Sequence, residues 1–531
     1  MHFTLIQPPL EDFYFTPHRA SGLGLQVLSI LLSRRGHTST ILNFPASGIQ
    51  CGSSEPGLPP FLAYLQPYIL PNEIGPVSFF HTFRRFGPDA GKCAAAVAAS
   101  RPDAVFLSIM AFCYSLAAIE LAAEIKRRCG SVPLIAGGAG ASVYPDYFLR
   151  SGAVDAVVPG EAEARLAPLL KELENGGMTT ACSGTAGPEM GGANPQEGFG
   201  PGASPGEPPP AEMLEFPFTV TGRTKKRLFI ATTATRGCNK ACAFCSVRLH
   251  HGGGMRKVPL RRAADGINSL KKKLETTAGA SPRDCAVSIN FEDDNLFTDP
   301  DYAFELIGLF RSAFPQPSFT SENGIDYLCL NDEVIIKMIE NGFFRFNLSL
   351  GTLQPSALRK QNRAGNSDRL REIALLLQHW GYTPAVYFIC GLPEDSPESI
   401  VETLLFLQKL QVKTGISLFY PVPGLPPLKT VDSVLQNDHF HPQLTAGASA
   451  YPWHGSLTTS QMITAFRLAR MNNLLLSDTS EEVQQIAGAA AASGTLYSTV
   501  QVNGTKRRVP VPGLDTTMVK LYFTNLTSKY A

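Results

Sequence analysis

Short apolar runs alternate with longer amphipathic stretches through the first 175 residues of the chain. The apolar runs are four to six residues long, as buried parallel strands are, and cover residues 3–6, 38–42, 104–109, 132–136 and 153–158. Helical periodicity marks the stretches between them, for example 23–35 and 116–128. This alternation predicts a doubly wound, Rossmann-like α/β domain over residues 1–175, which binds its ligand at the carboxyl ends of the strands.

One almost wholly apolar segment, residues 104–123, has the length of a membrane span. Asp103 and Glu120 bound its apolar part, and it divides into a strand at 104–109 and a helix that starts near Ser115. We therefore interpret it as a buried strand with its crossover helix, and predict no membrane span.

The remaining 356 residues divide into three regions by composition and pattern. Gly, Pro, Ala and Ser dominate 176–215, which predicts a flexible linker. Residues 216–425 hold about six strand–helix units, fewer than the eight of a complete barrel. Residues 426–531 predict two amphipathic helices (458–476 and 481–492) and a hairpin around Asn503-Gly504. We expect this small α+β region to cover the barrel mouth and the substrate.

The composition limits which binding partners and which cellular compartment we expect. The formal net charge is +1, so no overall field attracts nucleic acid or an anionic membrane, and we expect neither as a partner. Eleven cysteines without even pairing, in a chain without a signal peptide, indicate a reducing, cytoplasmic environment.

Three of these cysteines, Cys238, Cys242 and Cys245, fall within eight residues in the pattern Cys-x3-Cys-x2-Cys. Three thiolates at this spacing can hold one compact inorganic centre and leave one coordination position open. A structural zinc site needs four protein ligands, and His250 and His251 are the only nearby candidates for a fourth. The spacing favours a [4Fe–4S] cluster with one free iron, and zinc is the alternative.

With Phe244 before the third cysteine, this motif resembles that of the radical SAM enzymes. The resemblance implies a partial (β/α)6 barrel over 216–425 and S-adenosylmethionine (SAM) on the free iron. It places the SAM amino group against the acidic run Glu292-Asp293-Asp294, where a carboxylate suits an ammonium; a solvated turn is the alternative. Thr352-Leu353 stands where many relatives carry Glu-Ser, so Thr352 can offer the SAM ribose only a hydroxyl. The other implied SAM contacts are Ser349, Gly391 and Pro393.

Four segments of the N-terminal region, in order, resemble the cobalamin-binding domain that precedes many radical SAM domains. They are Pro8-Pro9 with Gly22-x-Gly24, PDAVFLSIMAF, PLIAGGAGAS and DAVVPGEAE. A nicotinamide site was the alternative for Gly22-x-Gly24, but no third glycine follows and Asn43 stands where an acidic residue is needed. The resemblance assigns cobalamin contacts to Ser108, Gly137, Gly138, Ser142, Gly160 and Glu161.

The signature Asp-x-His-x-x-Gly, which supplies a histidine to cobalt, is missing. His18 lies in the corresponding loop, either as an axial ligand or as an ordinary loop histidine. The resemblance implies a cobalamin whose own base is displaced and whose cobalt has no protein histidine.

Together these resemblances imply a cobalamin-dependent radical SAM methyltransferase that acts on an unactivated carbon of a small molecule or peptide. They also imply an electron donor such as flavodoxin or ferredoxin. A cyclisation, rearrangement or oxidation with the same cofactors is the nearest alternative. A methylthiotransferase would need further clustered cysteines and a basic tail, and a non-catalytic sensor is the binding-protein alternative.

Overall fold

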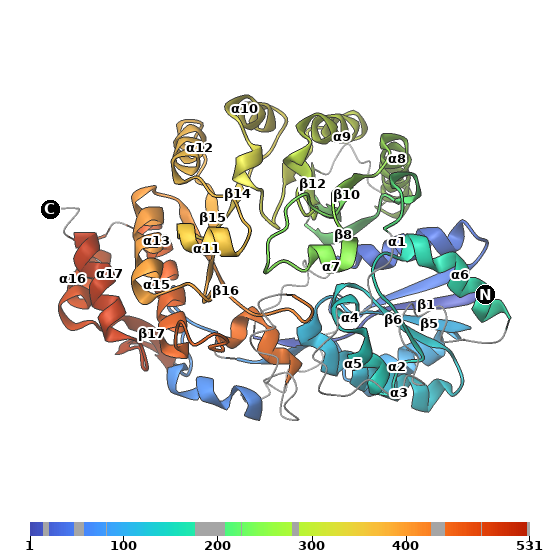
Figure 1. Cartoon of the computed structure of the whole chain (residues 1–531), viewed down its shortest axis with the longest axis horizontal. Helices are drawn as coiled ribbons and strands as arrows, with labels where there is room; N and C mark the ends of the chain where they lie inside the picture. The colour runs from blue at the N-terminus through green and yellow to red at the C-terminus, as the bar shows by residue number, and fades with distance from the viewer. Residues whose placement is uncertain are drawn as a thin grey trace.

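A computed structural model describes residues 1–13, 21–46, 58–80, 82–175, 208–224, 226–278, 286–425, 441–478 and 480–527. His18 and most of the predicted linker, 176–207, lie outside these residues. Within them the molecule has three parts: an N-terminal sheet with helices on both faces, an arch of strands and helices above it, and a C-terminal group of helices at one end of the arch (Figure 1).

The first part is built on a sheet of five parallel strands, which are β1 (His2–Gln7), β3 (Thr38–Asn43), β5 (Ala104–Ser108), β6 (Leu134–Gly137) and β7 (Ala156–Val158). Their order is β3-β1-β5-β6-β7, so the direction in which the chain adds strands reverses between β1 and β5. In doubly wound sheets the ligand binds beyond the carboxyl ends of the strands at this reversal.

Alternate residues of each strand pack against different helices on the two faces of the sheet. Val105 and Leu107 of β5 share one core with α2 (Ala90–Ala99) and α3 (Ser115–Cys129). Ala104 and Phe106 share another core with α1 (Leu23–Ser33) and α6 (Ala162–Glu174). The strand and helix predicted for 104–123 are both present. Helices α1 and α6 thus lie on one face of the sheet. Helices α2 and α3, with the short α4 (Ala139–Val143) and α5 (Pro145–Arg150), contribute to the other core.

The second part contains six parallel strands, which are β9 (Arg227–Thr232), β12 (Ala286–Phe291), β13 (Ser318–Thr320), β14 (Asn347–Gly351), β15 (Ala385–Cys390) and β16 (Lys413–Leu418). Parallel bridges from Phe319 to Phe343 and from Ile325 to Leu348 join the β9–β12–β13 group to the β14–β15–β16 group. An additional strand, β8 (Phe218–Arg223), pairs antiparallel with β9. The predicted six-unit partial barrel is therefore confirmed.

Helices form the outer layer of this barrel (Figure 1). They follow the amphipathic periodicity of the sequence, and their apolar faces join the strands in one large core. The outer helices are α8 (Leu260–Ala278), α9 (Pro300–Ala313), α10 (Asp332–Glu340), α12 (Ser367–His379) and α13 (Pro397–Lys409). Two short helices, α7 (Val247–His251) and α11 (Pro355–Lys360), lie in loops at the carboxyl ends of the strands.

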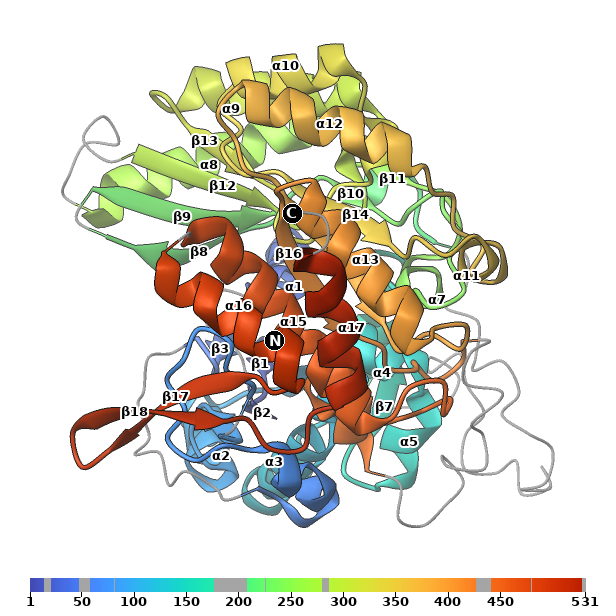
Figure 2. The same ribbon diagram turned by 90° about the vertical axis from the view of Figure 1, so that its left-hand side faces the viewer.

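The C-terminal part packs beside β16, at the open side of the partial barrel (Figure 2). Its elements are α15 (Thr459–Ser477), α16 (Glu481–Ser493), α17 (Thr516–Thr527), β17 (Tyr497–Val502) and β18 (Thr505–Pro510). Two of its helices, α15 and α16, and its hairpin match the predicted elements within two residues, and the helix α17 was not predicted. None of the helices that the structure describes is long and apolar enough to span a bilayer.

One segment of the first 175 residues packs with the C-terminal part instead of the N-terminal sheet. It contains the 3-10 helix η2 (Pro60–Tyr68) and contributes Leu62 and Leu65 to the barrel core. Glu73 and Arg467 form a fully buried ion pair, with Oε1 and Nη1 2.6 Å apart. After β3 the chain therefore runs to the C-terminal part of the molecule, and it then comes back to add β5, β6 and β7 to the sheet.

Candidate functional site

A cavity of about 460 Å³ lies between the carboxyl ends of the N-terminal strands and the barrel. Gln7 at the end of β1 and Ser108 at the end of β5 line it, which places it at the reversal of strand order. Gly137, Gly138, Gly160 and Glu161, four of the other residues assigned to cobalamin from the sequence, also line it. The barrel contributes Thr233, Thr235, Arg236, His250, His251, Glu292, Asp294 and Asn323.

The cavity has an apolar wall that reaches between the sheet and two helices. Its apolar side chains come from α1, α6 and the sheet face between them, and include Val27, Leu28, Phe106, Ile135, Leu166 and Leu169. A wall of this kind accommodates a flat apolar ring and excludes water from it.

Two buried polar atoms in the cavity wall have no hydrogen-bond partner among the residues that the structure describes. They are Nε2 of Gln7 and Oε1 of Glu163, whose residues are 3% exposed. A buried polar atom without a partner costs about 1–3 kcal/mol. The cavity thus fits a ligand with both an apolar ring and polar groups, as the nucleotide tail of cobalamin has.

The glycine-rich loop after β6 is shaped by close packing against the loop after β5. Gly138 has φ of 91°, and a Cβ there would lie 2.7 Å from the carbonyl oxygen of Ile109. A Cβ on Gly140 would lie 2.6 Å from the carbonyl carbon of Ala111. At these two positions the neighbouring backbone fills the space that a side chain would need.

Ser142 lies behind this loop and does not line the cavity. Its hydroxyl donates to the carbonyl of Gly138 (2.8 Å) and accepts from the amide of Gly160 (2.9 Å). It also lies 3.1 Å from Nδ1 of His250 in the barrel. Ser142 therefore holds two loops and a histidine together, and its contact with the cofactor stays a prediction.

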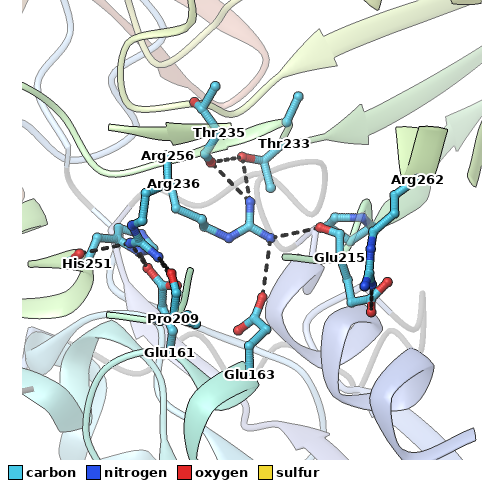
Figure 3. A network of polar contacts seen from close by, with 12 residues as sticks. Glu161, Glu163, Pro209, Glu215, Thr233, Thr235, Arg236, His251, Arg256 and Arg262 are labelled. Atoms are coloured by element: carbon cyan, nitrogen blue, oxygen red, sulfur yellow. Dashed lines mark hydrogen bonds and ion pairs between the residues drawn. The ribbon is translucent and has the colours of Figure 1, made fainter. Parts of the chain in front are cut away.

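Glu161 is the centre of an ion-pair network between the N-terminal part and the barrel (Figure 3). Its carboxylate accepts two hydrogen bonds from Arg256 (2.5 and 2.8 Å) and lies 2.6 Å from Nδ1 of His251. Burial acts to raise the pKa of Glu161, but the hydrogen bonds from Arg256 and His251 outweigh it and lower the pKa to about 2. The residue we assigned to cobalamin thus also fastens the two parts together.

Arg236 extends the network toward the cysteine motif. Its guanidinium donates to the carbonyl oxygens of Thr235 (3.1 Å) and Glu215 (3.3 Å) and lies 3.9 Å from the carboxylate of Glu163 (Figure 3). Glu215 in turn binds Arg34 of α1 and Arg262 of α8. The cavity is therefore closed on this side by charged groups that hold each other in place.

The three cysteines lie in the loop between the short strand β10 (Thr235–Arg236) and α7. Asp293 fixes the start of this loop: its Oδ1 accepts from the amides of Ala234 (2.9 Å) and Thr235 (2.6 Å) and from the Thr235 hydroxyl (2.6 Å). Asp293 is 1% exposed, and burial raises its pKa to about 6. Its Oδ2 has no hydrogen-bond partner among the described residues, so its assignment as a SAM contact stays a prediction.

The other two acids of the run do face the cavity. Glu292 accepts a hydrogen bond from the hydroxyl of Ser21 (2.7 Å). Asp294 accepts one from the amide of Gly237 (3.1 Å), directly before the first cysteine. Glu292 and Asp294 are therefore the carboxylates of this run that can meet a ligand's ammonium group.

The cysteine side chains are surrounded by hydrogen-bond donors. Asn295 Nδ2 lies 4.0 Å from the sulfur of Cys238, and Arg363 Nη1 lies 3.7 Å from that of Cys242. Burial raises the pKa of Cys238, and raises that of Cys245 to about 11. These thiols would thus be neutral on their own, and a bound metal centre would supply the charge that makes them thiolates.

In the described part of the chain, no three His, Cys, Asp or Glu side chains converge closely enough to hold one metal ion. Cysteines that bind a cluster are attached to different irons and need not converge on one point. Phe244 is partly buried between the second and third cysteines, and Cys390 is fully buried in the core.

The remaining SAM candidates lie at later strand ends. The carbonyl of Ser349 accepts from Arg363 (2.6 Å). Thr352 is buried, and its hydroxyl accepts from the amide of Gln354 (3.2 Å), so the side chain shapes the turn before α11. Gly391, with φ of 101°, donates its amide to Asp395 (2.8 Å), and Pro393 follows in the same turn. Thr352 and Gly391 thus have structural roles at these strand ends.

The sequence interpretation missed Gln7, Glu163, Asn295 and Arg363 as site residues. Asn295 directly follows the acidic run, so its position after a strand could have indicated it, whereas Arg363 comes after the short helix α11. For Gln7 and Glu163 the informative signal is burial without a partner, which only the structure shows.

Comparison with known proteins agrees with these features. Residues 232–407 match the model of the Radical SAM superfamily, so the chain contains a radical SAM domain. It is similar to bacteriochlorophyllide d C-12(1)-methyltransferase of Chlorobaculum tepidum (24% identity; 40% of this chain, 45% of that protein). It is also similar to hopanoid C-3 methylase of Methylococcus capsulatus (22% identity; 61% of this chain, 60% of that protein). The matched segments thus span about half the length of these relatives.

A solved structure of TsrM from Kitasatospora setae, a radical SAM methyltransferase with cobalamin and a [4Fe–4S] cluster bound, has a similar fold. The TM-score is 0.54 at 16% identity, and the match covers 80% of this chain and 76% of that one. A match over this share of both chains shows that they share their fold.

Proposed function

We propose that this chain, a radical SAM enzyme, uses cobalamin to methylate an unactivated carbon of a small molecule or peptide. One observation carries the proposal: a single cavity joins the strand ends of the N-terminal sheet to the barrel residues beside the cysteine loop. Support comes from the two relatives, a methyltransferase and a methylase, and from TsrM, which binds cobalamin and a [4Fe–4S] cluster on a similar fold.

When bound, the cluster and SAM supply a radical and cobalamin supplies the methyl group. Cys238, Cys242 and Cys245 hold the cluster in this proposal, and Asn295 and Arg363 donate toward their sulfurs. Hydrogen bonds of this kind stabilise negative charge on thiolate ligands and tune the reduction potential of the cluster.

The acids at the end of β12 bind the SAM ammonium in this proposal. Glu292 and Asp294 face the cavity, and each also accepts a hydrogen bond from the protein, which fixes its orientation. A fixed carboxylate forms a charge-assisted hydrogen bond with an ammonium group. Ser349 and Pro393, at later strand ends, are the proposed contacts to the rest of SAM.

The N-terminal strand ends bind the nucleotide tail of cobalamin in this proposal. Ser108, Gly137 and Gly160 line the cavity, and Gln7 and Glu163 offer the tail the two polar atoms that lack a protein hydrogen bond. Leu166 and the other apolar side chains of α1 and α6 exclude water around the base.

The test is a product analysis with anaerobically reconstituted protein, SAM, cobalamin and a reductant such as reduced flavodoxin or ferredoxin. We expect 5′-deoxyadenosine and S-adenosylhomocysteine, and a substrate that gains one CH2. Cys242→Ser removes a cluster ligand and should abolish both SAM products; Cys129→Ser, on α3, is the matched control. A substrate of unchanged or hydrogen-poor mass would instead indicate cyclisation, rearrangement or oxidation. Absence of both SAM products from the cluster-loaded protein would contradict enzymatic function.

A further inference from the structure

The loop that carries the three cysteines reaches the protein surface between its first and second cysteine. Asn239 is exposed there, and the side chain of Lys240 is 34% exposed. Cys242, two residues further on, is buried. In the proposed function, the cluster that these cysteines hold therefore lies directly beneath a patch of protein surface.

The residues that follow α11 are hydrogen-bonded to this loop. The carbonyl of Gln361 accepts from the amide of Ala243 (2.9 Å), and Nδ2 of Asn362 donates to the carbonyl of Ala241 (3.2 Å). Arg363, the next residue, donates toward the sulfur of the second cysteine. The end of α11 thus belongs to the immediate surroundings of the cysteines.

Exposed basic side chains flank the loop on α7 and α11, which lie on the same side of the molecule (Figure 2). Arg248 belongs to α7, which begins two residues after the third cysteine, and Arg359 and Lys360 belong to α11. We call these three residues the basic rim. Neither Arg248 nor Arg359 forms an ion pair with a residue that the structure describes. Lys360 lies 3.4 Å from Glu394, but its side chain is 68% exposed.

The acids that pair with cations at this surface are turned inward. The side chain of Glu394 is 9% exposed, and that of Asp326, which pairs with Lys240, is 11% exposed. An exposed acid, Glu402 of α13, accepts from Gln354 at the start of α11 and borders the rim. The outermost charges beside the cysteine loop are therefore positive, although the formal net charge of the whole chain is only +1.

We infer that the basic rim docks a small acidic electron-transfer protein, which reduces the cluster. The inference rests on the proposed function, because reductive cleavage of SAM needs one electron for each SAM. In this step one electron leaves the donor, which is oxidised, and enters the cluster, which is reduced, and no bond forms or breaks. Electron-transfer complexes bury little surface, so their encounter depends on complementary charge. A positive rim beside a shallow redox centre fits a donor with negative charges around its own.

The test measures 5′-deoxyadenosine formation from SAM by the full-length, cluster-loaded protein with two reductants. One is reduced flavodoxin, the acidic protein probe, and the other is photoreduced deazariboflavin, a small uncharged molecule that needs no docking surface. At limiting flavodoxin and low salt, Arg248→Glu/Arg359→Glu should react about tenfold more slowly than wild type, because steering by charge speeds encounter by about 10–10³. The difference should shrink at high salt. With deazariboflavin the two proteins should react equally fast.

Two controls separate local from overall charge. Lys226→Glu/Lys413→Glu makes the same change in net charge at two exposed positions, next to the amino ends of β9 and β16, and should behave as wild type with both reductants. Arg248→Lys/Arg359→Lys keeps the positive charges and should retain the flavodoxin rate.

Four results would overturn the inference. They are a flavodoxin rate that the double reversal leaves unchanged at low salt, an equal loss in the Lys226→Glu/Lys413→Glu control, a loss with both reductants, and wild-type protein that deazariboflavin reduces but flavodoxin does not. In all four cases wild-type protein cleaves SAM and the proposed function stands. Wild-type protein that forms no 5′-deoxyadenosine with either reductant would contradict the proposed function itself.

Discussion

Replacing Glu161 with glutamine should weaken the fold by an amount that depends on pH. Glu161 is 7% exposed, and its carboxylate binds Arg256 and His251 across the boundary between the N-terminal part and the barrel. Glutamine has the same shape but no charge, so Glu161→Gln removes the ion pairs and leaves the partly buried Arg256 next to Arg236 without them. Breaking a buried ion pair in this way is strongly destabilising.

The magnitude follows from the pKa of Glu161, which falls from 4.5 to about 2 in the folded protein. Each tenfold change in proton affinity corresponds to 1.36 kcal/mol, so this difference corresponds to about 3 kcal/mol. Because the folded pKa is depressed, this stability is fully present above pH 4.5 and is lost as the pH falls toward 2.

The assay is urea unfolding of the cofactor-free protein between pH 3 and pH 8, with wild type and Glu161→Gln compared at each pH. We expect Glu161→Gln to unfold at lower urea with a constant difference above pH 5, and the difference to shrink below it. Glu124→Gln is the control, because Glu124 pairs with Arg127 and Arg128 on an exposed helix face, where ion pairs contribute little. Equal stability of the two proteins at pH 7, or a gap that widens in acid, would refute the reasoning.

Three further predictions concern the cysteine loop and the packing of the C-terminal part. Cys242→Ala should lose the visible absorbance of the cluster, while Cys390→Ala, in the barrel core, should retain it. Asp293→Ala leaves the amides of Ala234 and Thr235 without an acceptor, at about 1–3 kcal/mol each, so a chelator should remove iron faster than from the exposed control Asp301→Ala. Arg467→Ala leaves Glu73 charged and buried, which should lower the free energy of unfolding by about 3–5 kcal/mol. The surface control Arg345→Ala should be unchanged in the same denaturation measurement.

The elements that local pattern specifies were predictable. The strand and helix within 104–123 follow from periodicity, and the hairpin at 497–510 follows from Asn503-Gly504 between alternating residues. The six-unit barrel follows from the same alternation repeated along the chain. In each case the residues that determine the element are neighbours in the sequence.

Roles that depend on distant partners were not predictable. Asp293 is one of three consecutive acids, and only its contacts with Ala234 and Thr235, more than fifty residues earlier, show that it supports the cysteine loop. Ser142 and His250 are separated by 108 residues and belong to different parts of the molecule. The packing of 58–80 against α15 depends on Glu73 and Arg467, 394 residues apart. No periodic pattern in the sequence reveals which residues form such pairs.

The most direct test of a shared two-cofactor cavity is the iron and cobalamin content of anaerobically reconstituted protein, with Leu166→Trp as the comparison. Tryptophan at position 166 fills the apolar wall between α6 and the sheet without touching the cysteine loop. We predict about four irons and one cobalamin per wild-type chain, and the same iron without cobalamin in Leu166→Trp. Wild-type protein that holds its iron but takes up no cobalamin would contradict the shared cavity, and so would cobalamin binding that Leu166→Trp leaves unchanged.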